Sequence, residues 1–203
     1  NWSVRGKVEE PGEYTIPSKL FFDYVSLLPN ETIHLHANDQ SVNVECGTYK
    51  TKINGLTSSE FPLVPRVQGE LSVQIPVEDF KRALTQILFA VATNESRPEL
   101  TGVAFQFSSH AGEGRLTLAS TDSYRLAEAT IPVVSPIVED HSLVVPAKTL
   151  SEVNRILSVF RDDVELPSSL SLSISGSQVV FMYGSVELIS RTIDEQYPDY
   201  RQI

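Results

Sequence analysis

The stretch Leu143-Val144-Val145-Pro146-Ala147-Lys148 has an earlier counterpart in the chain, Tyr14-Thr15-Ile16-Pro17-Ser18-Lys19. A helix-like segment follows each stretch, Thr149 to Phe160 in one case and Leu20 to Leu28 in the other. Apolar residues recur in both segments at positions i, i+3, i+6 and i+7, the spacing of a helix that lies on a sheet. This match indicates that the chain repeats a structural unit. The corresponding stripes are Phe21, Tyr24, Leu27 and Leu28 in one copy and Leu150, Val153, Ile156 and Leu157 in the other.

Strand-like runs follow each of these helices. In the first copy Thr32–Ala37 and Ser41–Cys46 flank a polar turn, and in the second Leu170–Ser175 and Gln178–Tyr183 flank Gly176-Ser177. Both turn sequences are typical of a β-hairpin. A further strand-like run ends each copy. The repeated unit is therefore a strand, a helix and three strands.

A third, more divergent copy lies between these two. It opens at Ser72–Pro76 and continues into a helix with an apolar stripe. Three strands are predicted after this helix, at Leu100–Phe107, at Arg115–Ser120 and from about Arg125 to Val133. The stripe residues are Val77, Phe80, Leu84, Ile87, Leu88 and Val91.

The repeat predicts an α+β fold and a division into domains. One unit is too small to bury its own apolar face, so two units should pair into one domain. The expected boundary is Pro62–Gln68, because prolines 62 and 65 interrupt regular structure. Residues 66–203 would then form a complete two-unit domain. Residues 1–65 would form one half of another domain, and we expect further sequence upstream of it.

Composition and charge restrict the possible functions. The 41% apolar and 21% charged residues are ordinary for a soluble globular protein, and no apolar run is long enough for a membrane helix. Cys46 is the only cysteine, so no intrachain disulfide forms, which fits a reducing cytoplasm. The formal charge of −10 argues against nucleic-acid binding unless the lysines and arginines gather on one face.

Residues that could carry out catalysis or bind a metal are weakly arranged. His34 and His36 alternate on a predicted strand, but a zinc site needs a third and usually a fourth ligand, so exposed strand histidines are favoured. Ser108-Ser109-His110 and Asp140-His141-Ser142 contain the residue types of a hydrolase triad. Triads are assembled in space, however, and neighbours in a polar loop are weak evidence. We predict no enzyme activity, no metal and no cofactor.

Four further blocks of sequence are Leu100–Phe105, Leu118–Ala127, Val145–Lys148 and Tyr197–Arg201. In order and spacing they resemble the beta subunit of bacterial DNA polymerase III, the sliding clamp, over essentially the whole chain. The resemblance implies a DNA-clamp fold in which each subunit has three domains of two units. Residues 1–65 would be the C-terminal half of the first domain and residues 66–203 the central domain.

The resemblance also implies a function. Clamp subunits associate head to tail as a homodimer, encircle double-stranded DNA without sequence preference, and have no catalytic activity of their own. Lys148 and Arg155 are seven residues apart and share one face of the predicted helix, opposite its apolar stripe. Charge patterning alone favours an ordinary solvated helix face. With the resemblance, the residues expected to contact DNA phosphates are Lys148, Arg155, Lys81, Arg82 and Lys19.

A second implied site is a pocket for short peptides of partner proteins, such as the DNA polymerase and clamp-loader subunits. Such a pocket combines an apolar groove with a few polar groups that orient an extended peptide. Ser123 stands where glycine is common in the family, and Gln202 where a basic residue is common. Composition alone favours Leu100, Leu126 and Ile203 as core residues. The implied residues are Arg97, Leu100, Thr121, Ser123, Tyr124, Arg125, Leu126, Pro198, Gln202 and Ile203.

The alternative hypothesis is a stand-alone protein-interaction module with the same repeat and no role on DNA. Both hypotheses predict a protein without membrane association. They differ in the genomic reading frame, because only a clamp requires a half-domain upstream and a third domain downstream.

Overall fold

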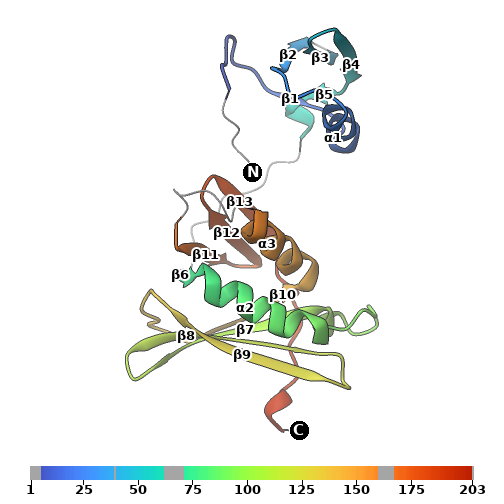
Figure 1. Cartoon of the computed structure of the whole chain (residues 1–203). Coiled ribbons are helices and arrows are strands. Elements are labelled where there is room, and N and C mark those ends of the chain that lie inside the picture. Colours follow the sequence, from blue (N-terminus) through green and yellow to red (C-terminus); the bar gives the residue numbers. More distant parts are fainter. Residues whose placement is uncertain (1–5, 39, 62–70, 160–166, 203) are drawn as a thin grey trace. The chain divides into compact units, whose positions relative to one another are not determined.

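The computed structural model describes residues 6–38, 40–61, 71–159 and 167–202 (Figure 1). The described residues fall into two compact units, a smaller one within residues 6–61 and a larger one within residues 71–202. The expected boundary segment, 62–68, lies outside the described residues. Among the described residues, no helix is long and apolar enough to cross a membrane.

The larger unit contains two copies of the repeat. In each copy a strand leads directly into a helix, and three antiparallel strands follow. The first copy consists of β6 (Leu71–Pro76), α2 (Val77–Ile87), short 3₁₀ turns at Leu88–Ala90 and Pro98–Thr101, β7 (Gly102–His110), β8 (Glu113–Thr121) and β9 (Leu126–Val133). The second consists of β10 (His141–Pro146), α3 (Ala147–Val159), β11 (Ser169–Ser175), β12 (Gln178–Tyr183), β13 (Val186–Arg191) and a 3₁₀ turn at Tyr200–Gln202.

The two copies exchange their first strands. One sheet has the order β10-β7-β8-β9 and the other β13-β12-β11-β6. Strand β6 of the first copy therefore pairs with β11 of the second, with Val73 opposite Leu172. Strand β10 of the second copy pairs in turn with β7 of the first, with Val145 opposite Val103. Each sheet is completed by a strand from the other copy, which explains why two units are needed for one domain.

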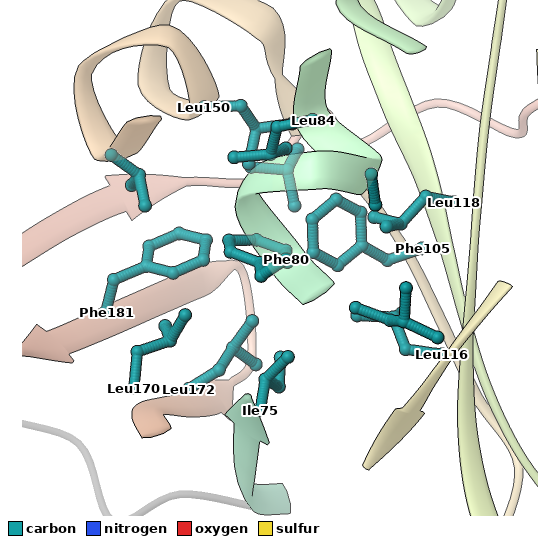
Figure 2. Close-up of a cluster of buried hydrophobic side chains, with 14 of the residues drawn as sticks. Ile75, Phe80, Leu84, Phe105, Leu116, Leu118, Leu150, Leu170, Leu172 and Phe181 are labelled. Carbon is teal, nitrogen blue, oxygen red and sulfur yellow. The ribbon is translucent and has the colours of Figure 1, made fainter. Parts of the chain in front are cut away.

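The core lies between the two sheets and the two helices. Phe80 of α2 is fully buried and stacks on Phe181 of β12, with ring centroids 6.3 Å apart. Its ring also packs edge-on against Phe105 of β7, with the ring centroids 6.3 Å apart. Figure 2 shows Phe80 between these two rings, each from a different sheet. Aromatic pairs of this geometry add about 0.5–1.5 kcal/mol each beyond the area they bury.

The smaller unit contains one copy of the repeat. Its elements are β1 (Tyr14–Thr15), α1 (Ser18–Ser26), β2 (His34–Asn38), β3 (Ser41–Cys46), β4 (Tyr49–Asn54), β5 (Leu56–Thr57) and a 3₁₀ turn at Ser58–Glu60. Strands β2, β3 and β4 form an antiparallel sheet in that order, and β1 pairs with β5. Val42, Val44 and Ile53 form a small buried cluster, against which Phe21, Tyr24 and Leu28 pack while partly exposed.

The apolar stripe predicted for α1 is wrong at one position. Leu27 lies just past the helix and is 83% exposed, whereas the corresponding Ile156 of α3 is 5% exposed. The reason lies in the neighbouring sheet: Ile156 shares an apolar surface with Val186 and Leu188 of β13. Strand β4 carries Tyr49 and Thr51 at the matching positions, and these offer less aliphatic surface.

Candidate functional site

Helix α3 presents the two basic residues predicted to face DNA. Lys148 and Arg155 are both exposed, while Leu150, Val153 and Leu157 on the other side of the helix are buried. Helix α3 packs beside α2, so the exposed sides of both helices belong to one surface of the larger unit (Figure 1).

Arg155 is held by an acidic neighbour one turn away. Its Nε donates a hydrogen bond of 2.9 Å to Glu152 Oε2, and a second guanidinium nitrogen contacts Glu152 Oε1. These bonds raise the pKa of Arg155 and lower the pKa of Glu152. Both side chains are largely in water, where such pairs contribute little stability. A phosphate would therefore compete with Glu152 for this guanidinium.

Helix α2 contributes one exposed cation instead of the expected two. Arg82 is exposed and pairs with Asp79. The expectation that Lys81 lies on the free side of the helix is wrong, because its side chain is only 11% exposed and its ammonium reaches Glu78 at 3.3 Å. The prediction considered only the stripe that faces a sheet. Helix α2 contacts α3 as well as β9, so its buried face is wider and covers the aliphatic stem of the lysine.

Lys19 is exposed on α1 in the smaller unit and bonds Asp23 at 2.7 Å. Three of the four exposed candidate cations thus have an acidic partner on their own helix. Within the described part of the chain, Lys148 is the candidate cation with no ion pair. On the exposed sides of α2 and α3, a phosphate would find one free ammonium and two guanidinium groups that are already paired.

The loop between β8 and β9, part of the predicted peptide pocket, is held by hydrogen bonds to Asp122. Asp122 Oδ1 accepts hydrogen bonds of 2.9 Å from the backbone N–H groups of Tyr124 and Arg125. Its Oδ2 accepts another of 2.9 Å from Arg125 Nε. These bonds, led by the backbone of Arg125, lower the pKa of Asp122. The turn places Ser123 at φ 77°, a left-handed conformation in which glycine is favoured.

Three contacts join this loop to other segments. Arg97 Nη1 donates to Ser123 Oγ at 3.2 Å. The backbone N–H of Thr121 donates to Tyr197 Oη at 3.0 Å. The guanidinium of Arg125 lies 5.8 Å from the centre of the Phe89 ring, within the range of a cation–π contact. Residues from four separate parts of the chain therefore meet at one end of β8.

The predicted pocket residues differ in what they offer a ligand. Tyr124 is 97% exposed and Leu126 is 46% exposed, so both present open apolar surface. Leu100 and Thr121 are buried, and Pro198 is half-buried. The burial of Leu100 fits the core role that composition alone favours. Gln202 bonds Asp199 within its own turn. Ile203 lies outside the described residues.

Sequence reasoning missed two members of this cluster. Phe89, 58% exposed, adds apolar surface next to Arg125, and Tyr197 supports the Thr121 backbone. A large aromatic residue that stands just after α2 but off the predicted apolar stripe is the sequence signal that could have indicated Phe89. A cleft of about 510 Å³ lies between β7, β10 and the segment 192–197; Tyr197 is one of its lining residues, but none of the residues predicted for the pocket lines it.

Two tyrosines near the β8–β9 loop have a raised pKa. Burial raises the pKa of Tyr197 to about 12, and burial together with a 2.6 Å hydrogen bond to Glu128 raises the pKa of Tyr200 to about 12. Phenols in the unfolded chain ionise near pH ~10. The stability from the two neutral phenols is therefore complete below pH ~10 and is lost as the pH rises toward ~12.

Phenolate absorbance during alkaline titration measures this effect. In the folded protein three of the seven tyrosines should ionise after those of the denatured protein: Tyr197, Tyr200 and Tyr183, whose pKa burial also raises. Tyr197→Phe and Tyr200→Phe should each remove one late-ionising group. The same titration in denaturant is the control. Coincident folded and denatured titrations would contradict the assignment.

Other candidate chemistry receives no support from the geometry. His34 and His36 are both exposed on β2. In the residues that the structure describes, no three histidine, cysteine, aspartate or glutamate side chains lie close enough to share a metal ion.

Known proteins match this chain along nearly its whole length. The beta sliding clamp of Staphylococcus aureus (strain Mu50) is 31% identical over 193 residues, which cover 95% of this chain and 48% of that protein. The DNA polymerase sliding clamp structure from Bacillus subtilis is 30% identical, with a TM-score of 0.84, and covers 97% of this chain and 49% of its own. A sliding clamp from Bartonella birtlesii bound to griselimycin is 26% identical, with a TM-score of 0.90, over 99% of this chain and 53% of its own.

The exchanged strand-helix-three-strand units are thus those of an α+β DNA clamp. Two family models match the chain, one over each part. The model of the N-terminal domain of the DNA polymerase III beta subunit matches residues 2–65, and that of the central domain matches residues 74–199. The chain belongs to the DNA polymerase III beta subunit family. It spans about half the length of the curated relatives that it matches.

Proposed function

We propose that this chain is part of a sliding clamp that encircles duplex DNA, tethers the replicative polymerase and other replication proteins, and confers processivity. The observation that carries this proposal is the placement of Lys148, Arg82 and Arg155 on the exposed sides of two adjacent helices. Contact between such cations and phosphates is independent of sequence and sensitive to salt, as sliding requires. The proposal assigns the chain no catalytic role.

The geometry also supports a docking role at the β8–β9 loop. Tyr124, Leu126 and Phe89 expose apolar surface there, and Arg97 and Arg125 add polar groups that could orient a peptide. We propose that short peptides of DNA polymerase and clamp-loader subunits bind here. In the full-length subunit, head-to-tail homodimerisation would close the ring.

Retention on circular DNA tests the encircling function. The full-length subunit, loaded onto nicked circular DNA, should elute with the circle during gel filtration, because a closed ring cannot leave an endless duplex. Cutting the circle with a restriction enzyme should release the protein. Equal retention on circular and linear DNA would refute encirclement, and no retention on either would favour an interaction module without a DNA role.

A further inference from the structure

The proposed peptide site draws on two segments, the β8–β9 loop and residues 197–202. The second segment carries Pro198 and Gln202, two of the residues predicted for the pocket. Among the described residues, its backbone hydrogen bonds are local: the N–H of Tyr200 donates to Pro198, and that of Gln202 to Asp199. No backbone hydrogen bond in the described part of the chain joins it to a strand. Side chains must therefore hold this segment in place.

A row of three residues on the outer side of one sheet receives the segment. Ala104 of β7, Ala119 of β8 and Glu128 of β9 lie side by side across three strands. The neighbouring residues Phe105 and Leu118 belong to the core between the sheets. Successive side chains of a strand point to opposite sides, so this row lies on the side away from the core.

Tyr200 covers this row. Its ring and that of Tyr197 pack on the two alanines, which are buried although they lie on the outer side of the sheet. The Tyr200 hydroxyl donates a hydrogen bond of 2.6 Å to Glu128 Oε2. A bond of this length from a hydroxyl to a carboxylate belongs to the strong, charge-assisted kind. It ties the segment 197–202 to β9.

Glu128 lies next to the peptide site on its own strand. Leu126, two positions earlier on β9, is 46% exposed and belongs to the predicted pocket. Alternate residues of a strand point to the same side, so Leu126 and Glu128 share one side of the sheet. The carboxylate thus connects the strand of Leu126 with the segment that carries Pro198 and Gln202.

The contacts of Tyr200 continue into the β8–β9 loop. Its ring meets that of Tyr197 edge-on, with the centroids 6.5 Å apart. Tyr197 Oη accepts a hydrogen bond from the backbone N–H of Thr121. The Thr121 hydroxyl accepts a bond from the N–H of Ser123 and donates one to the carbonyl of Arg125. A shift of Tyr200 would therefore reach both segments of the site.

We propose that Glu128 is a positioning residue of the peptide site. By holding Tyr200, it fixes the segment 197–202 next to the β8–β9 loop before a peptide arrives. A site that is ordered in advance binds more tightly, because the peptide does not have to order it. The inference rests on the docking role proposed above.

The affinity of the full-length subunit for a peptide tests this role. The probe is a fluorescent peptide, chosen from overlapping segments of the replicative polymerase by its binding to the wild-type subunit. Tyr200→Phe and Glu128→Ala should each raise its Kd about tenfold, because the peptide must then order a loosened segment. The double variant should bind no more weakly than either single variant, because both changes remove the same bond. Fluorescence anisotropy measures the Kd.

Two further variants separate positioning from other roles. Glu128→Gln keeps an oxygen that can accept from the Tyr200 hydroxyl, so it should restore nearly wild-type affinity. Thr130→Val is the matched control on the same side of β9. It removes a 3.1 Å hydroxyl contact with Thr117 and should leave the Kd unchanged. Far-ultraviolet circular dichroism reports whether each variant is folded, and Tyr200→Phe, which keeps the ring, decides if Glu128→Ala does not fold.

The outcomes distinguish this inference from the docking proposal. Wild-type affinity in Tyr200→Phe would overturn the role of Glu128 while docking itself stands. An equal loss in Glu128→Gln and Glu128→Ala would also overturn it, because the charge would then matter and the bond to Tyr200 would not. If no polymerase segment binds the wild-type subunit, the docking proposal fails and this inference fails with it.

Discussion

Replacing Phe80 with Ala should lower the free energy of unfolding of the larger unit by about 3–5 kcal/mol, the usual cost of a buried Phe→Ala change. Urea denaturation followed by far-ultraviolet circular dichroism measures the change. Removing the ring deletes contacts with Phe105 of one sheet and Phe181 of the other. The cavity left by this substitution lies between the two sheets of the unit. Neither sheet alone can therefore collapse to fill it.

Phe89→Ala is the matched control for this prediction. Phe89 lies just after the same helix but is 58% exposed, and its ring makes a cation–π contact with Arg125. Loss of an exposed cation–π contact costs about 0.5–1 kcal/mol. If the two variants were equally destabilised, Phe80 would not be the link between the sheets.

Local patterns predicted the elements of this fold well. Strands β3 and β12 begin and end at the predicted residues, Ser41–Cys46 and Gln178–Tyr183. The helix stripe through Leu150, Val153 and Leu157 is buried as expected. These features depend on residue periodicity and turn chemistry within one segment.

Features that depend on contacts between copies could not be predicted in the same way. The exchange of β6 and β10 joins strands that are distant in the sequence, and no local pattern specifies that pairing. The burial of Lys81 follows from the position of a second helix beside α2. The meeting of Phe89, Arg97 and Tyr197 at the β8–β9 loop likewise needs the assembled domain.

The charge on the exposed side of α3 should control how tightly the full-length subunit holds DNA. Reversing both Lys148 and Arg155 to Glu should weaken equilibrium binding to duplex DNA. It should also reduce the magnitude of the slope of log affinity against log salt concentration by about 2. Each lost phosphate contact removes roughly one unit of that slope. Fluorescence anisotropy over a range of salt concentrations measures both quantities.

The two positions should not behave alike. Lys148 has no ion pair in the described part of the chain, so Lys148→Glu removes a cation that is free to bind phosphate. Arg155 is shared with Glu152, so part of its charge is already satisfied. We therefore expect the larger loss of affinity from Lys148→Glu. Glu152→Gln should act in the opposite direction and strengthen DNA binding, because it releases the guanidinium of Arg155.

Arg115→Glu provides the control of equal charge change. Arg115 is exposed on β8 next to the buried Leu116, so it points to the side of the sheet away from the core and the helices. This variant shifts the net charge as much as Lys148→Glu does, without altering the helix surface. If it weakened DNA binding equally, the response would report overall charge, and the assignment of α3 to the DNA-facing surface would be wrong.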